Sequence, residues 1–468
     1  MDTRSLFEQA ARLAASYRDG VGGSAAPLPY AAMREAFDAP TPEQGAPASE
    51  VIDDLVKRST PGLRAMTGPR FFGWVIGASH PVGVAADWLT AAWGQNAGNH
   101  EASPSGAAAE TVAAKWLLDL LDLPRGSSVG FVTGATIANF VCLAAARGAV
   151  LKQVGWNVEA NGLFGAPPIH VLIGDDAHTS VFSALQFLGL GHDRVVRVPT
   201  DTQGCIIAAE FARAISTCTG PTIVIAQAGQ LNTGAFDPIT DIIAPSRRSG
   251  AWVHIDGAFG LWARACPATA HLAADFDAAD SWATDGHKWL QTPYDCGYAI
   301  VRDAEAHRSA MTIAASYLPP VAEGDRDPSH YVPELSRRAR GFSTWAMIRH
   351  LGRDGIAAMI AEHCRLARVL AEKLAREPGV HVLNEVVLNQ VIVRFGTREA
   401  DQNADGMTQE TIRRIQADGT CFAGGARWRN RWVLRLSVIS APTTEADIVR
   451  TADAICTAWR AVARSNVN

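Results

Sequence analysis

Polar residues gather at the ends of three short apolar runs in this sequence. They are His254-Ile255-Asp256-Gly257-Ala258, Thr284-Asp285-Gly286-His287-Lys288-Trp289 and Asp175-Asp176-Ala177-His178. A fourth segment, Thr133-Gly134-Ala135-Thr136, turns directly from an apolar run into a helical pattern. Open α/β sheets bind ligands beyond the carboxyl ends of their strands, so all four segments are candidate parts of one site. Each segment alone also has an ordinary explanation, such as a helix cap, a turn or a solvated loop.

Together the four segments supply the parts that pyridoxal 5′-phosphate (PLP) chemistry needs. An aldehyde cofactor needs a lysine amine for a Schiff base, and the second segment contains a lysine. The pyridine nitrogen must stay protonated if the ring is to accept electrons, which an adjacent aspartate enforces. A phosphate suits the N–H groups at a helix N-terminus, with a threonine hydroxyl added. The combination therefore predicts a PLP enzyme.

At these residues the sequence resembles the group II PLP-dependent decarboxylases, the family of aromatic L-amino acid decarboxylase and glutamate decarboxylase. The resemblance runs from about Pro69 to Ser440. Its most specific elements are the His-Lys-Trp motif at 287–289, the His-x-Asp-x-Ala motif upstream, and Asp-Ala-His-x-Ser at 176–180. The supporting segments are Pro69-Arg70-Phe71-Phe72-Gly73, Ser103-Pro104 ahead of Glu110, Arg435-Leu436-Ser437, and Thr443-Thr444-Glu445.

The resemblance implies a role for each matching residue. Lys288 is expected to hold PLP as an internal aldimine, and Asp256 to pair with the pyridine nitrogen. Ala258 is expected to pack under the ring, and His178 to stack above it. The implied catalytic residues are Lys288, His178, Asp256 and Tyr331. The implied cofactor-binding residues are Ala135 and Thr136 at the phosphate, together with His178, Asp256, Ala258, Asp285, His287 and Lys288.

The substrate pocket departs from the family pattern. Trp74 replaces a tyrosine in one pocket segment, and the stretch 95–100 (Gln-Asn-Ala-Gly-Asn-His) is smaller and more polar than in the aromatic-acid enzymes. We expect Trp74, Asn96 and Gly98 to contact the substrate, whose identity the sequence does not fix. Trp74 as ordinary core, and Asn96 and Asn99 as caps of local backbone, are the alternatives.

One further departure concerns the residues near the cofactor oxygen. Family members often carry Gly-Thr-Thr where this chain reads Ala228–Gly234, so Gln230 or Thr233 is expected to contact the cofactor oxygen. The arginines at 337, 338 and 340 fit either a site near a carboxylate or a solvated helix start.

The resemblance also implies a proton donor, a tyrosine on a mobile loop ahead of the arginine-rich helix start. Ungapped counting puts Pro328 at that position, and Tyr331 lies three residues later. We assign the role to Tyr331, with His330 as its substitute. The alternative is a tyrosine that only docks the loop.

The leading functional hypothesis is α-decarboxylation of an L-amino acid to an amine and CO₂. A second is another PLP reaction on the same fold, namely aminotransfer, carbon–carbon lysis or decarboxylation-dependent oxidative deamination, because the same lysine, aspartate and phosphate site serve them all. A third, a non-enzymatic regulator, is disfavoured because Lys288 and Asp256 are both present.

The elements that must position these residues alternate between strand and helix patterns from about residue 105. Apolar or β-branched runs begin near residues 129, 170, 195, 222, 252, 281 and 298. Strands separated by helix-length segments predict βαβ units and a mostly parallel, doubly wound sheet. This agrees with the aspartate-aminotransferase fold (fold type I) that the resemblance implies.

Three domains are expected. Residues 1–85 would form a helical arm, with helices at 1–20 and 51–58, a linker at 20–50, and a dimerisation role. Residues 86–365 would form the large PLP-binding domain. After a helix from Trp345 to about Arg376, the runs HVLNE, NQVIVRF, TCFAG and RWVLRLSV predict a smaller α+β domain at 366–468. The resemblance implies a homodimer in which the 95–100 segment completes the partner's site.

The composition and charge indicate which classes of function are supported. Apolar residues make up 48% and charged residues 19%, as in a folded enzyme. A net charge of −5 gives no support for nucleic-acid binding, and the apolar runs are too short to predict a membrane span. Eight scattered cysteines indicate reduced thiols and a cytoplasmic location. The histidine spacing predicts no metal site. A small-molecule amino acid is the expected partner.

Overall fold

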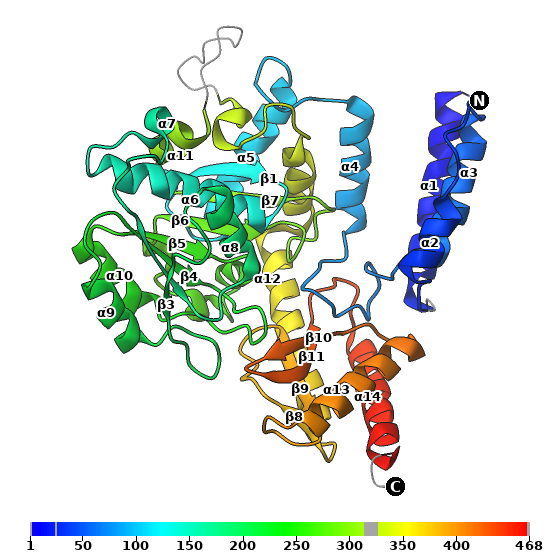
Figure 1. Cartoon of the computed structure of the whole chain (residues 1–468). Coiled ribbons are helices and arrows are strands. Elements are labelled where there is room, and N and C mark those ends of the chain that lie inside the picture. The colour runs from blue at the N-terminus through cyan, green and yellow to red at the C-terminus, as the bar shows by residue number, and fades with distance from the viewer. Residues whose placement is uncertain (1, 24–25, 313–325, 466–468) are drawn as a thin grey trace. The chain divides into compact units, whose positions relative to one another are not determined.

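The computed structural model describes residues 2–23, 26–312 and 326–465 (Figure 1). These residues form two compact units. The large unit comprises Ser79–Arg368 and Asn384–Val391, and the small unit comprises Met1–Ala78, Val369–Leu383 and Ile392–Asn468. By contacts, the N-terminal arm therefore groups with the C-terminal region of the chain.

A seven-stranded sheet forms the centre of the large unit, in the order β1-β7-β6-β5-β4-β2-β3. The strands β2 to β6 pair in parallel, while β7 is antiparallel to both of its neighbours. All seven strands predicted from the sequence are present, and the mostly parallel α/β sheet is confirmed. The strands are β1 (Ser128–Val132), β2 (His170–Gly174), β3 (Val196–Val198), β4 (Thr222–Gln227), β5 (Trp252–Asp256), β6 (Ser281–Asp285) and β7 (Gly297–Val301).

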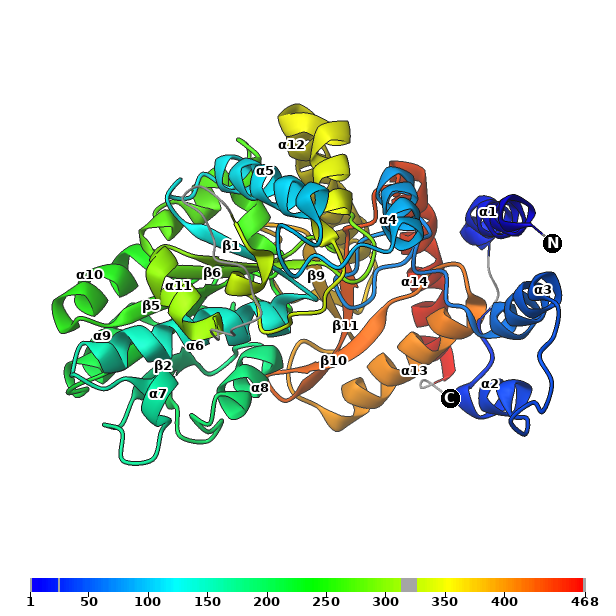
Figure 2. The same cartoon turned by 90° about the horizontal axis from the view of Figure 1, so that it is seen from above.

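Helices cover both faces of this sheet. In Figure 2, α5 and α12 lie on one side of the strands, and α6 and α8 lie on the other. This double cover explains why the central strands β4, β5, β6 and β7 are buried along their whole length. The helices of the large unit are α4 (Pro81–Trp93), α5 (Pro104–Leu120), α6 (Ala135–Lys152), α7 (Val158–Asn161), α8 (Thr179–Phe187), α9 (Ala208–Ser216), α10 (Ile239–Ser249), α11 (Ala304–Met311) and the first part of α12 (Arg340–Ala375).

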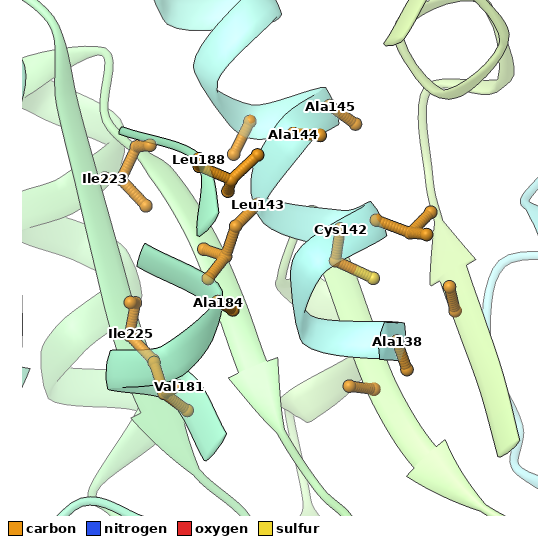
Figure 3. Close-up of a cluster of buried hydrophobic side chains, with 14 of the residues drawn as sticks. Ala138, Cys142, Leu143, Ala144, Ala145, Val181, Ala184, Leu188, Ile223 and Ile225 are labelled. Carbon is orange, nitrogen blue, oxygen red and sulfur yellow. The ribbon is translucent and has the colours of Figure 1, made fainter. Parts of the chain in front are cut away.

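Helix α6 is the centre of the main apolar core (Figure 3). Small side chains at Ala144, Ala145 and Ala146 let it approach the sheet, and Leu143 meets residues from β4 and α8. Among the described helices, α6 alone has the length and apolar composition to cross a membrane, which the sequence did not lead us to expect. Its apolar character follows from its place in the core, since 61% of the helix is buried.

The small unit is built on a four-stranded sheet of order β10-β11-β9-β8. Its strands are β8 (Val380–Val382), β9 (Gln390–Phe395), β10 (Gly424–Trp428) and β11 (Arg431–Ser437), and its helices are α1 (Thr3–Gly20), α2 (Tyr30–Phe37), α3 (Ala48–Ser59), α13 (Gln402–Asp418) and α14 (Glu445–Ser465). The predicted end of the long helix near Arg376 is confirmed, since α12 ends at Ala375.

Two sequence expectations for this unit are wrong. The stretch 20–50 is more than a linker, because it contains α2. The run TCFAG is no strand of the sheet. Phe422 instead exchanges backbone hydrogen bonds with Arg70 and Phe72, and the ladder begins only at β10. These two hydrogen bonds pair the backbone N–H and carbonyl groups of Phe422 as well as a strand ladder would.

Candidate active site

Two aspartates come together at one edge of the large sheet. Asp256 ends β5 and Asp285 ends β6, and these strands are parallel neighbours. Lys288 follows in the turn after β6, and its Nζ lies 3.1 Å from Asp285 Oδ2. Both carboxylates are buried, so a nearby cation offsets part of the cost of removing them from water.

Asp256 has the environment that a protonated pyridine nitrogen requires. Its side chain is 5% exposed, and within the described residues its Oδ1 has no hydrogen-bond partner. Burial raises the pKa of the Asp256 carboxyl, while the nearby His178 and Lys288 lower it. A buried acceptor with no internal partner fits a donor on a bound group. The residues present therefore fit PLP.

The start of α6 contacts Asp285 directly. The Ala135 N–H donates to Asp285 Oδ1 at 2.6 Å. A Cβ placed on Gly134 would lie 3.0 Å from the His287 ring and 3.3 Å from Asp285, so a side chain at residue 134 would have to displace these neighbours by a few tenths of an ångström. Thr136, in the first turn, is exposed. Of the two predicted phosphate contacts, Ala135 thus already binds a carboxylate, whereas Thr136 remains accessible to an anion.

His178 lies at the N-terminus of α8, and its Nδ1 accepts from the Ser180 backbone N–H at 3.2 Å. Its electrostatic effect on Asp256 shows that the two side chains are neighbours. The carbonyl of Ala258 accepts the Asp285 N–H at 2.9 Å, which ties the turns after β5 and β6 together. The structure therefore brings His178, Asp256, Ala258, Asp285 and Lys288 to one place, and their individual roles stay predictions.

His287 and a tyrosine that the sequence analysis missed form the next part of the site. The Tyr294 ring stacks on His287 with centroids 4.4 Å apart, and 51% of Tyr294 is exposed. Burial lowers the pKa of His287, and burial together with Asp285 raises that of Tyr294. The available signal was an aromatic residue following proline shortly after the lysine motif.

The predicted contacts of Gln230 and Thr233 with a cofactor oxygen compete with bonds inside the protein. Gln230 donates from Nε2 to the Asp176 carbonyl at 3.1 Å and accepts two backbone N–H groups. Thr233 donates to the Gln203 carbonyl at 2.6 Å. Both side chains shape the loop after β4.

The segment 95–100 is anchored within its own chain. Asn96 Oδ1 accepts the Arg337 N–H at 3.0 Å, and the Gly98 carbonyl accepts the Ser329 N–H at 3.0 Å. Asn99 caps local backbone at Ala102, as the alternative interpretation proposed. The substrate contacts of Asn96 and Gly98 stay predictions.

The three arginines at the start of α12 are structural. Arg337 forms a buried ion pair with Glu110 at 2.6 Å. Arg338 pairs with Asp87 at 2.8 Å, and Arg340 with Asp295 at 2.9 Å. A solvated helix start is therefore wrong for Arg337 and Arg340, whose side chains are buried, whereas Arg338 is paired but partly exposed.

Tyr331 is fixed by neighbours outside the Lys288 cluster. Its carbonyl accepts from His307 Nε2 at 2.9 Å, and the Arg326 guanidinium lies 4.1 Å from its ring centre. His330 Nε2 lies 3.9 Å from Asp327. These contacts agree with a docking function, and the proton-donor role of Tyr331 stays a prediction.

Trp74 belongs to the small unit. Its side chain is 52% exposed and lies against Phe422, with ring centres 5.1 Å apart. Trp74 and Val75 both have positive φ, at 55° and 56°, which is unusual for bulky residues. Ordinary core is therefore the wrong interpretation of Trp74, and its substrate contact stays a prediction.

Comparison with known proteins identifies the family. The pyridoxal-dependent decarboxylase conserved domain matches residues 30–396. The chain belongs to this family. It is accordingly an amino-acid decarboxylase that uses PLP.

Individual decarboxylase relatives resemble most of the chain. Tryptophan decarboxylase 1 of Oryza sativa is 26% identical over 437 residues, 87% of this chain and 83% of the relative. Phenylacetaldehyde synthase of Arabidopsis thaliana is 24% identical over 431 residues, covering 88% and 86%. The structure of Oryza sativa TDC with PLP and tryptamine superposes with a TM-score of 0.90 at 23% identity, covering 98% of each chain. This likeness confirms the predicted fold.

Replacing Asp285 by asparagine should strengthen PLP binding. Asp285→Asn keeps an oxygen for the Ala135 N–H but removes a negative charge from the helix end expected to hold the phosphate. We expect the Kd for PLP, measured by absorbance titration, to fall about three- to tenfold. Asp303→Asn is the control, because Asp303 also accepts N–H groups at a helix start, that of α11. Weaker binding would show that Asp285 supports the cofactor.

Proposed function

We propose that this protein removes the α-carboxylate of an L-amino acid as CO₂ and releases the amine, with PLP attached covalently to Lys288. One observation carries the proposal. At the ends of two adjacent parallel strands lie a buried carboxylate oxygen without an internal partner, on Asp256, and the lysine held by Asp285. The first suits a pyridinium nitrogen and the second an aldehyde.

Bound PLP supplies the electron sink that stabilises the carbanion left by departing CO₂. Asp256 would hold a proton at the pyridine nitrogen, because its buried Oδ1, which has no partner among the described residues, gains most from a charged donor. Asp285 orients the Lys288 amine through its Oδ2 and the start of α6 through its Oδ1. His178 would contact the substrate side of the site.

The substrate class is part of the proposal. Relatives that act on aromatic amino acids by name make these the first compounds to test. The small and polar Asn96 and Gly98 also favour testing polar amino acids. A panel of the twenty amino acids, with CO₂, amine, keto acid and aldehyde measured, separates decarboxylation from the other PLP reactions.

We infer that the active form is a homodimer, with the 95–100 segment completing the partner's site. Helix α4 supports this inference. Trp88 and Leu89 on this helix are 46% and 50% exposed, and Asp87 is its single charged side chain. An exposed apolar patch of this kind is typical of a protein interface. We also propose a cytoplasmic location, which fits eight free cysteines of which six are buried.

Lys288→Ala should abolish both cofactor attachment and turnover. The wild type should show a visible absorption band, because a lysine conjugated to PLP absorbs there, and the variant should lack it. Borohydride reduction followed by peptide mapping should label Lys288 alone. Lys152→Ala, a change at the end of α6, is the control and should keep the band. A label on another lysine would refute the assignment.

Charges on α4 should separate the subunits. Trp88→Glu combined with Leu89→Glu would bury two carboxylates in the proposed interface, which costs several kcal/mol. We expect sedimentation of the variant as a monomer with at least about tenfold lower turnover. Phe164→Glu, at a side chain that is 98% exposed, is the control. A wild-type protein that is monomeric and active would contradict the dimer.

Decarboxylation-dependent oxidative deamination is the second candidate function. Pro328 stands at the family position of the proton donor, and Tyr331 is held by His307 and Arg326. If the proton returns slowly, dioxygen would act as the oxidant, and with water the products would be CO₂, the aldehyde, ammonia and hydrogen peroxide. A similar protein, from Arabidopsis thaliana, carries the name phenylacetaldehyde synthase.

Tyr331→Phe distinguishes the two candidates. If Tyr331 delivers the proton, the variant should still release CO₂ while amine per CO₂ falls and aldehyde appears under oxygen. If Tyr331 only docks its loop, amine per CO₂ should stay unchanged. Aldehyde as the main product of the wild type would favour the oxidative reaction.

A further inference from the structure

A row of hydrogen-bonded side chains crosses the interior of the large unit and ends at the active site. Its members are Trp252, Ser281, His254, Asn139, Ser180 and His178. Successive polar atoms lie 2.9, 2.9, 2.8, 3.4 and 2.7 Å apart. All members except His178 are buried, so bulk water does not compete for these bonds.

The donor and acceptor capacities of the groups set a direction for the row. Trp252 Nε1–H can only donate, so Ser281 Oγ accepts from it. On its other side the His254 ring faces Asn139 Oδ1, which can only accept, so His254 Nδ1 is the nitrogen that accepts the Ser281 hydroxyl proton. Burial lowers the pKa of His254 to about 3, so the ring is neutral and has one proton. With Nδ1 as the acceptor, that proton is on Nε2.

The same direction continues through Asn139 to the site. His254 Nε2–H donates to Asn139 Oδ1, and Asn139 Nδ2 donates to Ser180 Oγ. Ser180 Oγ lies 2.7 Å from His178 Nδ1 and can donate its hydroxyl proton to that nitrogen. The Ser180 backbone N–H donates to the same nitrogen at 3.2 Å. Two donors converge on Nδ1, so the proton of a neutral His178 ring belongs on Nε2.

We propose that Ser180, Asn139, His254 and Ser281 are positioning residues that hold His178 in its Nε2–H tautomer. The row presents a hydrogen-bond donor, and not a lone pair, on the edge of His178 away from Ser180. The consequence for catalysis rests on the function proposed above. An N–H donor attracts a substrate carboxylate, whereas a lone pair would repel it.

The test is NMR of the holoenzyme labelled with ¹⁵N-histidine, with the His178 signals assigned by their loss in His178→Gln. The wild type should show the Nε2–H pattern. Ser180→Ala removes one of the two donors to Nδ1, and a fraction of the Nδ1–H or doubly protonated form should appear. We expect an accompanying loss in kcat of about fivefold, the size of one net hydrogen bond. Ser180→Thr, which keeps the hydroxyl, should restore both.

Asn139→Asp tests the direction of the row. A carboxylate at residue 139 can only accept, so the Ser180 hydroxyl would turn toward it and away from His178. The His178 spectrum should then change as in Ser180→Ala. Ser183→Ala is the matched control, because Ser183 lies on the same helix and donates to the Thr179 carbonyl at the surface. Its His178 spectrum should equal the wild type.

An unchanged His178 spectrum in Ser180→Ala would overturn the proposal, whether or not Asn139→Asp folds. The readout does not depend on turnover. If the spectra change as expected but no amino acid is decarboxylated, the tautomer assignment stands and the proposed function fails.

Discussion

Two buried carboxylates at neighbouring strand ends are the constraint around which this protein is organised. Parallel pairing of β5 and β6 brings Asp256 and Asp285 to the same edge of the sheet. Like charges in a buried place repel, so positive and N–H groups must surround them. Lys288 and the start of α6 satisfy Asp285, and His178 lies near Asp256. The oxygen of Asp256 that stays without an internal partner gives the site its capacity for a cationic ring nitrogen.

The core behind the site is mostly apolar, with one polar row through it. Helix α6 packs small residues against the sheet, yet it also contributes Asn139, which is fully buried. A buried polar group is costly unless it is paired, and Asn139 is paired on both sides. The same helix therefore supplies its first turn to the expected phosphate site and Asn139 to the support of His178. Helix α6 therefore both packs in the apolar core and supplies residues to the active site.

Helix α4, outside this core, has apolar side chains exposed on its surface. Helix α4 exposes tryptophan and leucine side chains, and the 95–100 segment that follows it is tied down by Arg337 and Ser329. A rigidly anchored polar segment next to an apolar helix suits a role at a partner's site. The ion pairs of the arginines at the start of α12 provide that rigidity.

The sequence by itself determined the α/β class, all seven strands of the large sheet, the lysine motif and the family, because strand periodicity and strand-end residues are local features. It could not determine that Ala135 donates to Asp285, that Tyr294 stacks on His287, or that α2 forms within 20–50. Such contacts join residues far apart in the chain or depend on packing against them. The direction of the hydrogen-bonded row to His178 was likewise decided only by tertiary structure, since it depends on which atoms meet.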